Sequence, residues 1–129
     1  MNSDITRGFS MPETWFREGC FISEWSNRDG DPECSIARAR VPAGTTTRRH
    51  RLAGITERYV ILDGRGRAEV DGQSFEVGPG DVVLIAPGTC QRITSHDNAE
   101  LVFLAVCTPR FRPEAYQDLE AAYSGSQRR

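Results

Sequence analysis

Short stretches of strand-forming residues, separated at regular intervals by glycine- and proline-containing turns, most constrain the fold of this chain. Asp63-Gly64 and Asp71-Gly72 are strong hairpin signals. Gly78-Pro79-Gly80-Asp81 and Ala86-Pro87-Gly88 interrupt the chain again. Some eight to ten short strands at such spacing predict an all-β sandwich or barrel. The sequence has no βαβ alternation, no phosphate-binding loop and no Gly-x-Ser-x-Gly elbow.

The 129 residues are expected to form a single domain, 1–129. Residues 1–14 form an N-terminal arm. A short C-terminal helix is expected over 113–123, because Pro113 suits a first helical position and apolar residues follow at helical spacing. Residues 124–129 are expected to be a flexible tail. The expected strands are 19–26, 34–41, 45–52, 56–62, 65–70, 73–77, 82–85, 91–95 and 100–107.

Composition excludes several classes of function. The net charge is −2 with both signs intermixed, which argues against binding to nucleic acid. No apolar run is long enough for a membrane span, so no membrane partner is expected. The N-terminal residues lack a secretory signal, and four widely spaced cysteines without a Cys-x-x-Cys are expected to be free thiols. These observations predict a cytoplasmic protein.

The stretch from Gly44 to Gly64 predicts two strands, 45–52 and 56–62, folded back at Ala53-Gly54. Directly opposed residues of a hairpin share a face. One face would then carry a guanidinium, an imidazole, a carboxylate and a phenol, which is an unusual set to point inward. The expected pairs are His50 with Glu57, Arg48 with Tyr59, and Leu52 with Ile55.

This stretch resembles the first motif of the cupin family, Gly-x5-His-x-His-x(3,4)-Glu-x6-Gly. Gly44, His50, Glu57 and Gly64 fit it, and Leu52 replaces the second His. The second motif, Gly-x5-Pro-x-Gly-x2-His, is matched in spacing from residue 80, with Ala86 for the Pro and Gln91 for the His. The resemblance covers residues 44–95.

The resemblance implies a double-stranded β-helix, the jelly-roll cupin barrel. It also implies a homodimer, for which the N-terminal strands carrying Phe21 and Trp25 would supply the interface.

In cupins that hold a metal, the motif His and Glu residues bind a divalent ion, usually Fe, Mn, Ni or Zn. Carried over position by position, the metal set here would be His50, Glu57 and Gln91. The amide oxygen of Gln91 is a poor ligand, so the set falls short of a two-His-one-carboxylate triad. The alternative is a metal-free polar cluster lining a pocket, in which Arg48 or His50 pairs with Glu57.

Two functions follow from the resemblance. The first is a small-molecule enzyme, a metal-dependent oxygenase or isomerase acting on a small organic acid, sugar or polyketide-like substrate. Glu57 would be its general base and His50 its acid–base partner. The alternative is a metal-free ligand-binding or sensing module, suggested by the two lost ligands. The expected substrate-binding residues are Arg48, Tyr59, Gln91 and Leu52.

Overall fold

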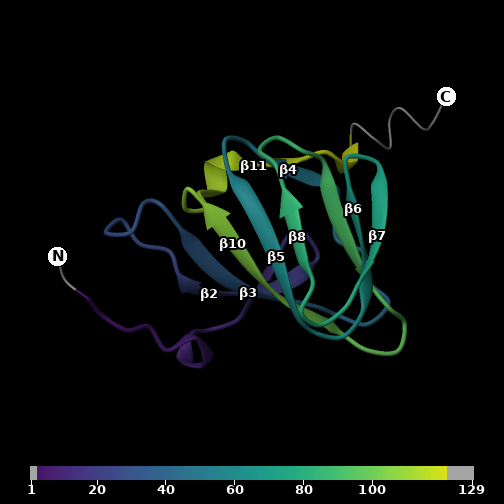
Figure 1. Cartoon of the computed structure of the whole chain (residues 1–129), viewed down its shortest axis with the longest axis horizontal. Helices are drawn as coiled ribbons and strands as arrows, with labels where there is room; N and C mark the ends of the chain where they lie inside the picture. Colours follow the sequence, from purple (N-terminus) through teal and green to yellow (C-terminus); the bar gives the residue numbers. More distant parts are fainter. Residues whose placement is uncertain (1–2, 122–129) are drawn as a thin grey trace.

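The computed structural model describes residues 3–121, whose strands form two antiparallel sheets (Figure 1). Sheet A has the order β1-β2-β3-β10-β5-β8, and sheet B the order β11-β4-β9-β6-β7. The strands of sheet A are β1 (Thr14–Phe16), β2 (Cys20–Ser26), β3 (Ser35–Val41), β5 (Thr56–Asp63), β8 (Val82–Ile85) and β10 (Leu101–Thr108). Those of sheet B are β4 (His50–Leu52), β6 (Gly66–Val70), β7 (Gln73–Val77), β9 (Gln91–Ser95) and β11 (Tyr116–Asp118). Two 3₁₀ turns, η1 (Gly8–Ser10) and η2 (Pro113–Ala115), complete the elements.

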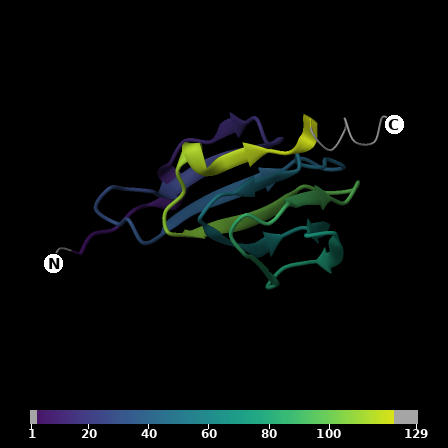
Figure 2. The same ribbon diagram turned by 90° about the horizontal axis from the view of Figure 1, so that it is seen from above.

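The all-β class predicted from the turns is confirmed, and each expected strand appears, although that over 45–52 is reduced to β4. The strand pairings of residues 3–121 join the strands into two separate sheets, so they do not show the closed barrel that the resemblance implies. Figure 2 shows the yellow segment after β10 returning across the molecule, where β11 pairs with β4.

The main core lies between the sheets, because its buried residues come from both. Strand alternation places Tyr59 and Ile61 of β5 and Phe103 of β10 on the inner face of sheet A. Ala68 of β6 and Ile93 of β9 face them from sheet B. A second, smaller cluster contains Leu52, Ile55, Cys107 and Tyr116.

The predicted hairpin between 45–52 and 56–62 is wrong. β4 pairs with β9 and β11 in sheet B, whereas β5 pairs with β10 and β8 in sheet A. His50 therefore lies opposite Gln91 and Asp118, and Glu57 lies opposite Ile85 and Cys107. The chain passes from one sheet to the other at the Ala53-Gly54 turn. β5 pairs with β10 over most of its length, and this pairing takes the place of the predicted hairpin with residues 45–52.

The predicted helix over 113–123 is also wrong over residues 113–118. Residues 113–115 form the 3₁₀ turn η2, and Tyr116–Asp118 form β11. Tyr116 packs into the small cluster, and Gln117 accepts a hydrogen bond from Arg51, so tertiary contacts outweigh the helical preference. Residues 122–123 and the expected tail, 124–129, lie outside the described residues.

The N-terminal arm is held against sheet A. The main-chain oxygen of Met11 accepts a hydrogen bond from Ser23, and Phe9 packs edge-on against Trp25. Phe21 contacts Trp15 and the guanidinium of Arg40. The homodimer predicted to form through these N-terminal strands stays a prediction. No helix within residues 3–121 has the length and apolarity needed to cross a membrane.

Gly64 is predicted to be more sensitive to alanine than Gly54. Both have left-handed φ values, +80° and +73°, which cost an alanine about 1–2 kcal/mol. A Cβ atom added at Gly64 would clash with the carbonyl oxygen of Glu100. A Cβ atom added at Gly54 would have no atom within 4 Å. Gly64→Ala should therefore lose roughly 1–3 kcal/mol more unfolding free energy than Gly54→Ala, because the Glu100 backbone must shift. Urea denaturation of the two variants checks this, and equal losses would contradict it.

Candidate functional site

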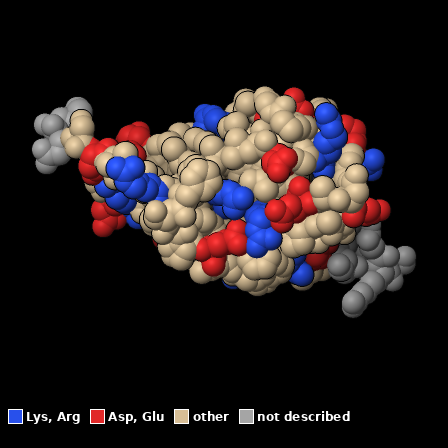
Figure 3. All heavy atoms as spheres, turned by 90° about the horizontal axis from the view of Figure 1, so that it is seen from below, with Lys and Arg blue, Asp and Glu red and all other residues tan. Residues whose placement is uncertain are grey.

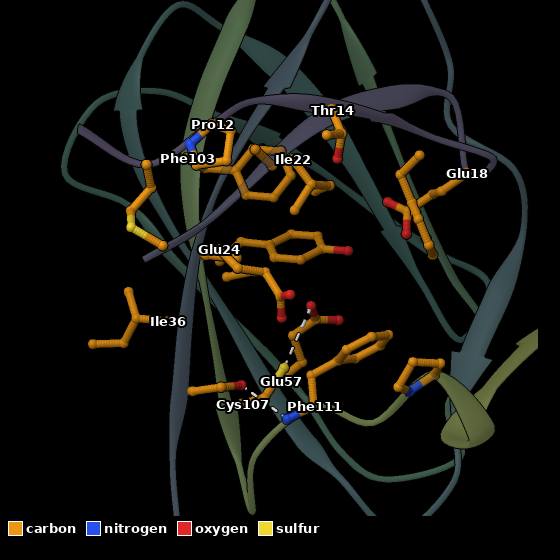
Figure 4. A pocket seen from close by; sticks show the side chains of 18 residues that line it. Pro12, Thr14, Glu18, Ile22, Glu24, Ile36, Glu57, Phe103, Cys107 and Phe111 are labelled. Carbon is orange, nitrogen blue, oxygen red and sulfur yellow. Dashed lines mark hydrogen bonds between the residues drawn. The ribbon is translucent and has the colours of Figure 1, made fainter. Parts of the chain in front are cut away.

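A pocket of about 450 Å³ lies over the inner face of sheet A, a size typical of small-molecule sites. Its floor comes from β3, β5 and β10, and its sides from β1, β2 and segments flanking the sheet. Figure 4 shows the carboxyl groups of Glu24 and Glu57 and the hydroxyl of Thr14 pointing into the space between the lining side chains. Most of the remaining lining is apolar.

Glu57 is the buried acid of this pocket. Its side chain lies on β5 and the residue is only 8% exposed. The Cys107 thiol donates to Oε2 at 3.9 Å, and Oε1 has no hydrogen-bond partner among the described residues. Burial, together with the nearby Glu18 charge, raises the pKa of Glu57 to about 7 against the opposing effects of His50, Gln91 and Cys107.

Glu18 is a second buried carboxyl in the pocket, and the sequence analysis did not identify it. It lies in the turn between β1 and β2, where Gly19 adopts a φ of +109°. Burial raises the pKa of Glu18 to about 7, partly offset by the hydrogen bond that the Cys20 thiol donates at 3.7 Å. A turn glutamate is ordinarily solvated, so the sequence carries no local signal of this burial.

His50 lies behind Glu18, and it is not among the residues that line the pocket. Its Nδ1 lies 2.7 Å from the carbonyl oxygen of Arg48, which only accepts, so Nδ1 carries a proton. Burial lowers the pKa of His50, which favours the neutral ring with an unprotonated Nε2. This Nε2 lies 3.4 Å from Oε1 of Glu18. The ring also stacks on Tyr116, with centroids 5.1 Å apart.

Tyr59 and Gln91 form a buried hydrogen bond between the sheets. The Tyr59 hydroxyl donates to Oε1 of Gln91 at 2.5 Å. The Tyr59 ring packs against Phe103 at 4.4 Å between centroids, and Tyr59 lines the pocket. Gln91 is 2% exposed and does not line it.

The other predicted contacts lie elsewhere. Arg48 does not pair with Glu57, because its guanidinium contacts Asp118 of β11 at 2.6 Å. It does not line the pocket. Leu52 belongs to the small apolar cluster and does not itself line the pocket, although Cys107 of the same cluster does. Of the predicted site residues, the structure therefore brings Glu57 and Tyr59 to the pocket and places His50 and Gln91 behind it.

The predicted metal set does not fit a metal in this arrangement. Within residues 3–121 no group of three or more His, Cys, Asp and Glu side chains is placed to hold an ion. The Nδ1 of His50 bonds the Arg48 carbonyl, and Oε1 of Gln91 accepts from Tyr59. Among the buried side-chain oxygen and nitrogen atoms of His50, Glu57 and Gln91, only Oε1 of Glu57 lacks a hydrogen-bond partner within residues 3–121. The binding of a divalent metal stays a prediction that no contact in the structure supports.

Replacing Glu57 by Gln is predicted to stabilise the protein at high pH. The folded-state pKa of about 7 exceeds the ordinary 4.5, so ionisation of Glu57 costs stability as the pH rises from about 4.5 to 7. Gln mimics the protonated acid. Glu57→Gln should exceed the unfolding free energy of the parent by less than about 1 kcal/mol near pH 5 and by on the order of 3 kcal/mol at pH 8.

Urea denaturation at the two pH values measures this difference. Glu76→Gln is the control, because Glu76 is exposed on β7 and bonded to Arg67. A Glu57→Gln variant with the same stability difference at both pH values would contradict the prediction.

Tyr59→Phe is predicted to destabilise the fold, and Tyr116→Phe is its matched control. The first change leaves the buried Oε1 of Gln91 without its donor, at a cost of about 1–3 kcal/mol. The Tyr116 hydroxyl has no hydrogen-bond partner within residues 3–121, so its removal should cost almost nothing. Thermal or urea unfolding measures the loss of stability in both variants. Equal losses in Tyr59→Phe and Tyr116→Phe would contradict the prediction.

Comparison with known proteins agrees with this architecture. A Methanocaldococcus jannaschii protein described as uncharacterized is 37% identical over 86 residues, 67% of this chain and 69% of that protein. An oxalate-binding protein of Thermotoga maritima is 34% identical over 71 residues, 55% of this chain and 59% of that protein. The solved structure of Pac13, a Streptomyces nucleoside dehydratase, has a TM-score of 0.77 at 13% identity and covers 92% of each chain, which shows a shared fold.

The cupin domain family matches residues 37–107, more than half of the chain. This span contains the degenerate motifs and most strands of both sheets. This match shows that the chain belongs to the cupin family.

Proposed function

We propose that this cupin binds a small organic molecule in the sheet A pocket and acts on it by general acid–base chemistry, as an isomerase or lyase that needs no metal. The observation that carries the proposal is the buried Oε1 of Glu57, which lines the pocket and lacks a hydrogen-bond partner in the described structure. An unsatisfied buried carboxyl costs stability, and such costs are concentrated at functional sites.

Glu57 and Glu18 suit proton transfer at neutral pH. Each has a pKa of about 7, so both protonation states are accessible. In an enolisation, ionised Glu57 takes the proton from a carbon next to a carbonyl as the C–H bond breaks. Protonated Glu18 gives its proton to the carbonyl oxygen, which leaves a neutral enol. In the reverse transfers Glu57 returns a proton to carbon and Glu18 regains its proton from the enol oxygen, so both carboxyl groups return to their starting protonation states.

His50 would act as a positioning residue for Glu18. Its Nε2 faces Oε1 of Glu18, and its Nδ1 is fixed by the Arg48 carbonyl. A neutral imidazole at this point accepts the Glu18 proton or returns it without adding net charge to the pocket. This role differs from direct contact with substrate, since His50 does not line the pocket.

The similar proteins support small-molecule chemistry and do not choose the substrate. One binds oxalate by its name, and another is a nucleoside dehydratase. Oxalate is a dianion, and the pocket lining here contains three carboxyl groups and, within residues 3–121, no Arg or His. Repulsion between like charges disfavours oxalate in this pocket. The same repulsion argues against the small organic acid predicted from sequence.

Glu57→Gln is predicted to abolish proton exchange catalysed by the protein. The test incubates metal-analysed, chelator-treated protein with hydroxyacetone, dihydroxyacetone and aminoacetone in D₂O, and proton NMR follows loss of the C–H signals next to the carbonyl. The parent protein should accelerate exchange for at least one ketone. Loss of the general base should reduce the rate about 10²–10⁴-fold. Glu76→Gln should keep the parent rate.

Three outcomes would overturn this function. Exchange that disappears with chelation and returns with Fe, Mn, Ni or Zn would favour the predicted metal enzyme. An unchanged rate in Glu57→Gln would remove Glu57 from the chemistry. Binding without exchange for all three ketones would favour the metal-free sensing module that the sequence left as the alternative.

A further inference from the structure

The charged groups of the pocket all have one sign. Its lining includes the carboxyl groups of Glu18, Glu24 and Glu57, and no Arg or His from the described residues. Glu24 is exposed, and its Oε2 accepts a hydrogen bond from Asn27 at 2.8 Å, whereas Glu18 and Glu57 are buried. A carboxylate in a largely apolar cavity is costly unless a donor or a cation meets it.

Strand alternation turns the nearby cations away from the pocket. Arg38 and Arg40 of β3 alternate with the lining residues Ala37 and Ala39, and both arginines contact Glu13. Arg58 of β5 lies between the lining residues Glu57 and Tyr59, and donates to Thr108. The face of the molecule shown in Figure 3 carries basic and acidic side chains interspersed, so it is mixed in sign. The single sign is therefore a property of the pocket.

One buried acceptor in this pocket is left for a ligand. Oε1 of Glu57 has no hydrogen-bond partner in residues 3–121, and the residue is more than nine-tenths buried. The groups facing Glu57 and Glu18 are neutral side chains: the thiols of Cys107 and Cys20, the Gln91 amide and the neutral imidazole of His50. Residues 3–121 thus supply no cation to these two carboxyl groups.

The walls suit a cation attached to an apolar body. Phe16 and Phe111 line the pocket and present aromatic rings, which attract ammonium groups electrostatically. Ile22 and Ile36 add aliphatic surface. An ammonium group supplies several N–H donors and a positive charge. It would therefore provide both the hydrogen-bond donor that Oε1 of Glu57 lacks and the positive charge that the carboxyl groups lack.

We propose that the natural ligand of this pocket carries a cationic nitrogen, an amine or amidine on a compact apolar body, held by Glu57 with Glu18 and Glu24. The proposal rests on the proposed function and specifies its substrate class. It excludes carboxylates and phosphates of similar size, which would bring a fourth negative group to three carboxyl groups that no lining cation offsets within the described chain.

A matched series of ligands with one shape and three charges tests this. The probes are 1-aminoadamantane, 1-adamantanol and adamantane-1-carboxylate, titrated into the full chain at pH 8 by isothermal calorimetry. Backbone amide NMR shifts at Tyr59, Phe103 and Ala105 locate the binding. The amine should bind at least tenfold more tightly than the alcohol. The carboxylate should bind at least tenfold more weakly than the alcohol.

Charge-removing variants assign the preference to the pocket. Glu57→Gln and Glu24→Gln should each reduce the affinity for the amine at least threefold and leave that for the alcohol unchanged. Glu76→Gln on β7 should alter neither affinity. Equal affinity for all three probes, tighter binding of the carboxylate, or an amine preference that survives both pocket variants would overturn the proposal.

The outcome is separable from that of the proposed function. Loss of proton exchange in Glu57→Gln together with no preference for the amine would keep the chemistry and reject the ligand class. A clear preference for the amine without any catalysed exchange would keep the ligand class and reject the chemistry.

Discussion

The pairing register of β10 with its two neighbours is the constraint on which the rest of the structure depends. Cys107 lies between Ser35 and Glu57, and Ala105 between Ala37 and Tyr59. These residues share the inner face, and a slip of one residue would send the side chains of one strand to solvent. The irregular pairing between Val102 and Phe103 adjusts the ladder at its other end. The pocket floor is therefore a direct result of strand register.

The same register creates an electrostatic problem, because it buries Glu57 in a pocket whose lining, within residues 3–121, contains no Arg or His. Glu57 is placed among apolar neighbours, and Glu18 is brought to it from a turn. Burial raises the pKa of both carboxyl groups to about 7, so each is only partly ionised at neutral pH, and the His50 ring lies beside Glu18. An acidic centre maintained in this way is stabilised by protonation, whereas a salt bridge would stabilise it by pairing.

Much of the fold was accessible from sequence because its signals are local. Turn glycines and alternation predicted the strands, and the degenerate motifs pointed to the family that the comparison confirmed. The partners of β4 could not be predicted, because alternation fixes which residues share a face and leaves the neighbouring strand open. The C-terminal segment was misread since Tyr116 packs with Leu52 in the small cluster, a contact invisible to helical periodicity.

The site was less predictable than the fold. Glu57 and Tyr59 reached the pocket because both lie on one long strand. Glu18 and Glu24 come from a turn and from β2, and no pattern of residues connects either with Glu57. His50 matched a metal motif and instead contacts a carbonyl and a carboxyl group, which depends on the path of neighbouring segments.

The pocket is assembled from two kinds of parts. Its floor belongs to the paired strands, whereas Met11, Pro12, Phe111 and Pro113 come from segments before β1 and after β10. Substitutions in those flanking segments change the shape of the opening without disturbing the ladder that holds Glu57. Related proteins can therefore differ in the ligands that enter the pocket while they keep Glu57 in the same place. Ligand preference can thus evolve separately from the sheet that holds the acid.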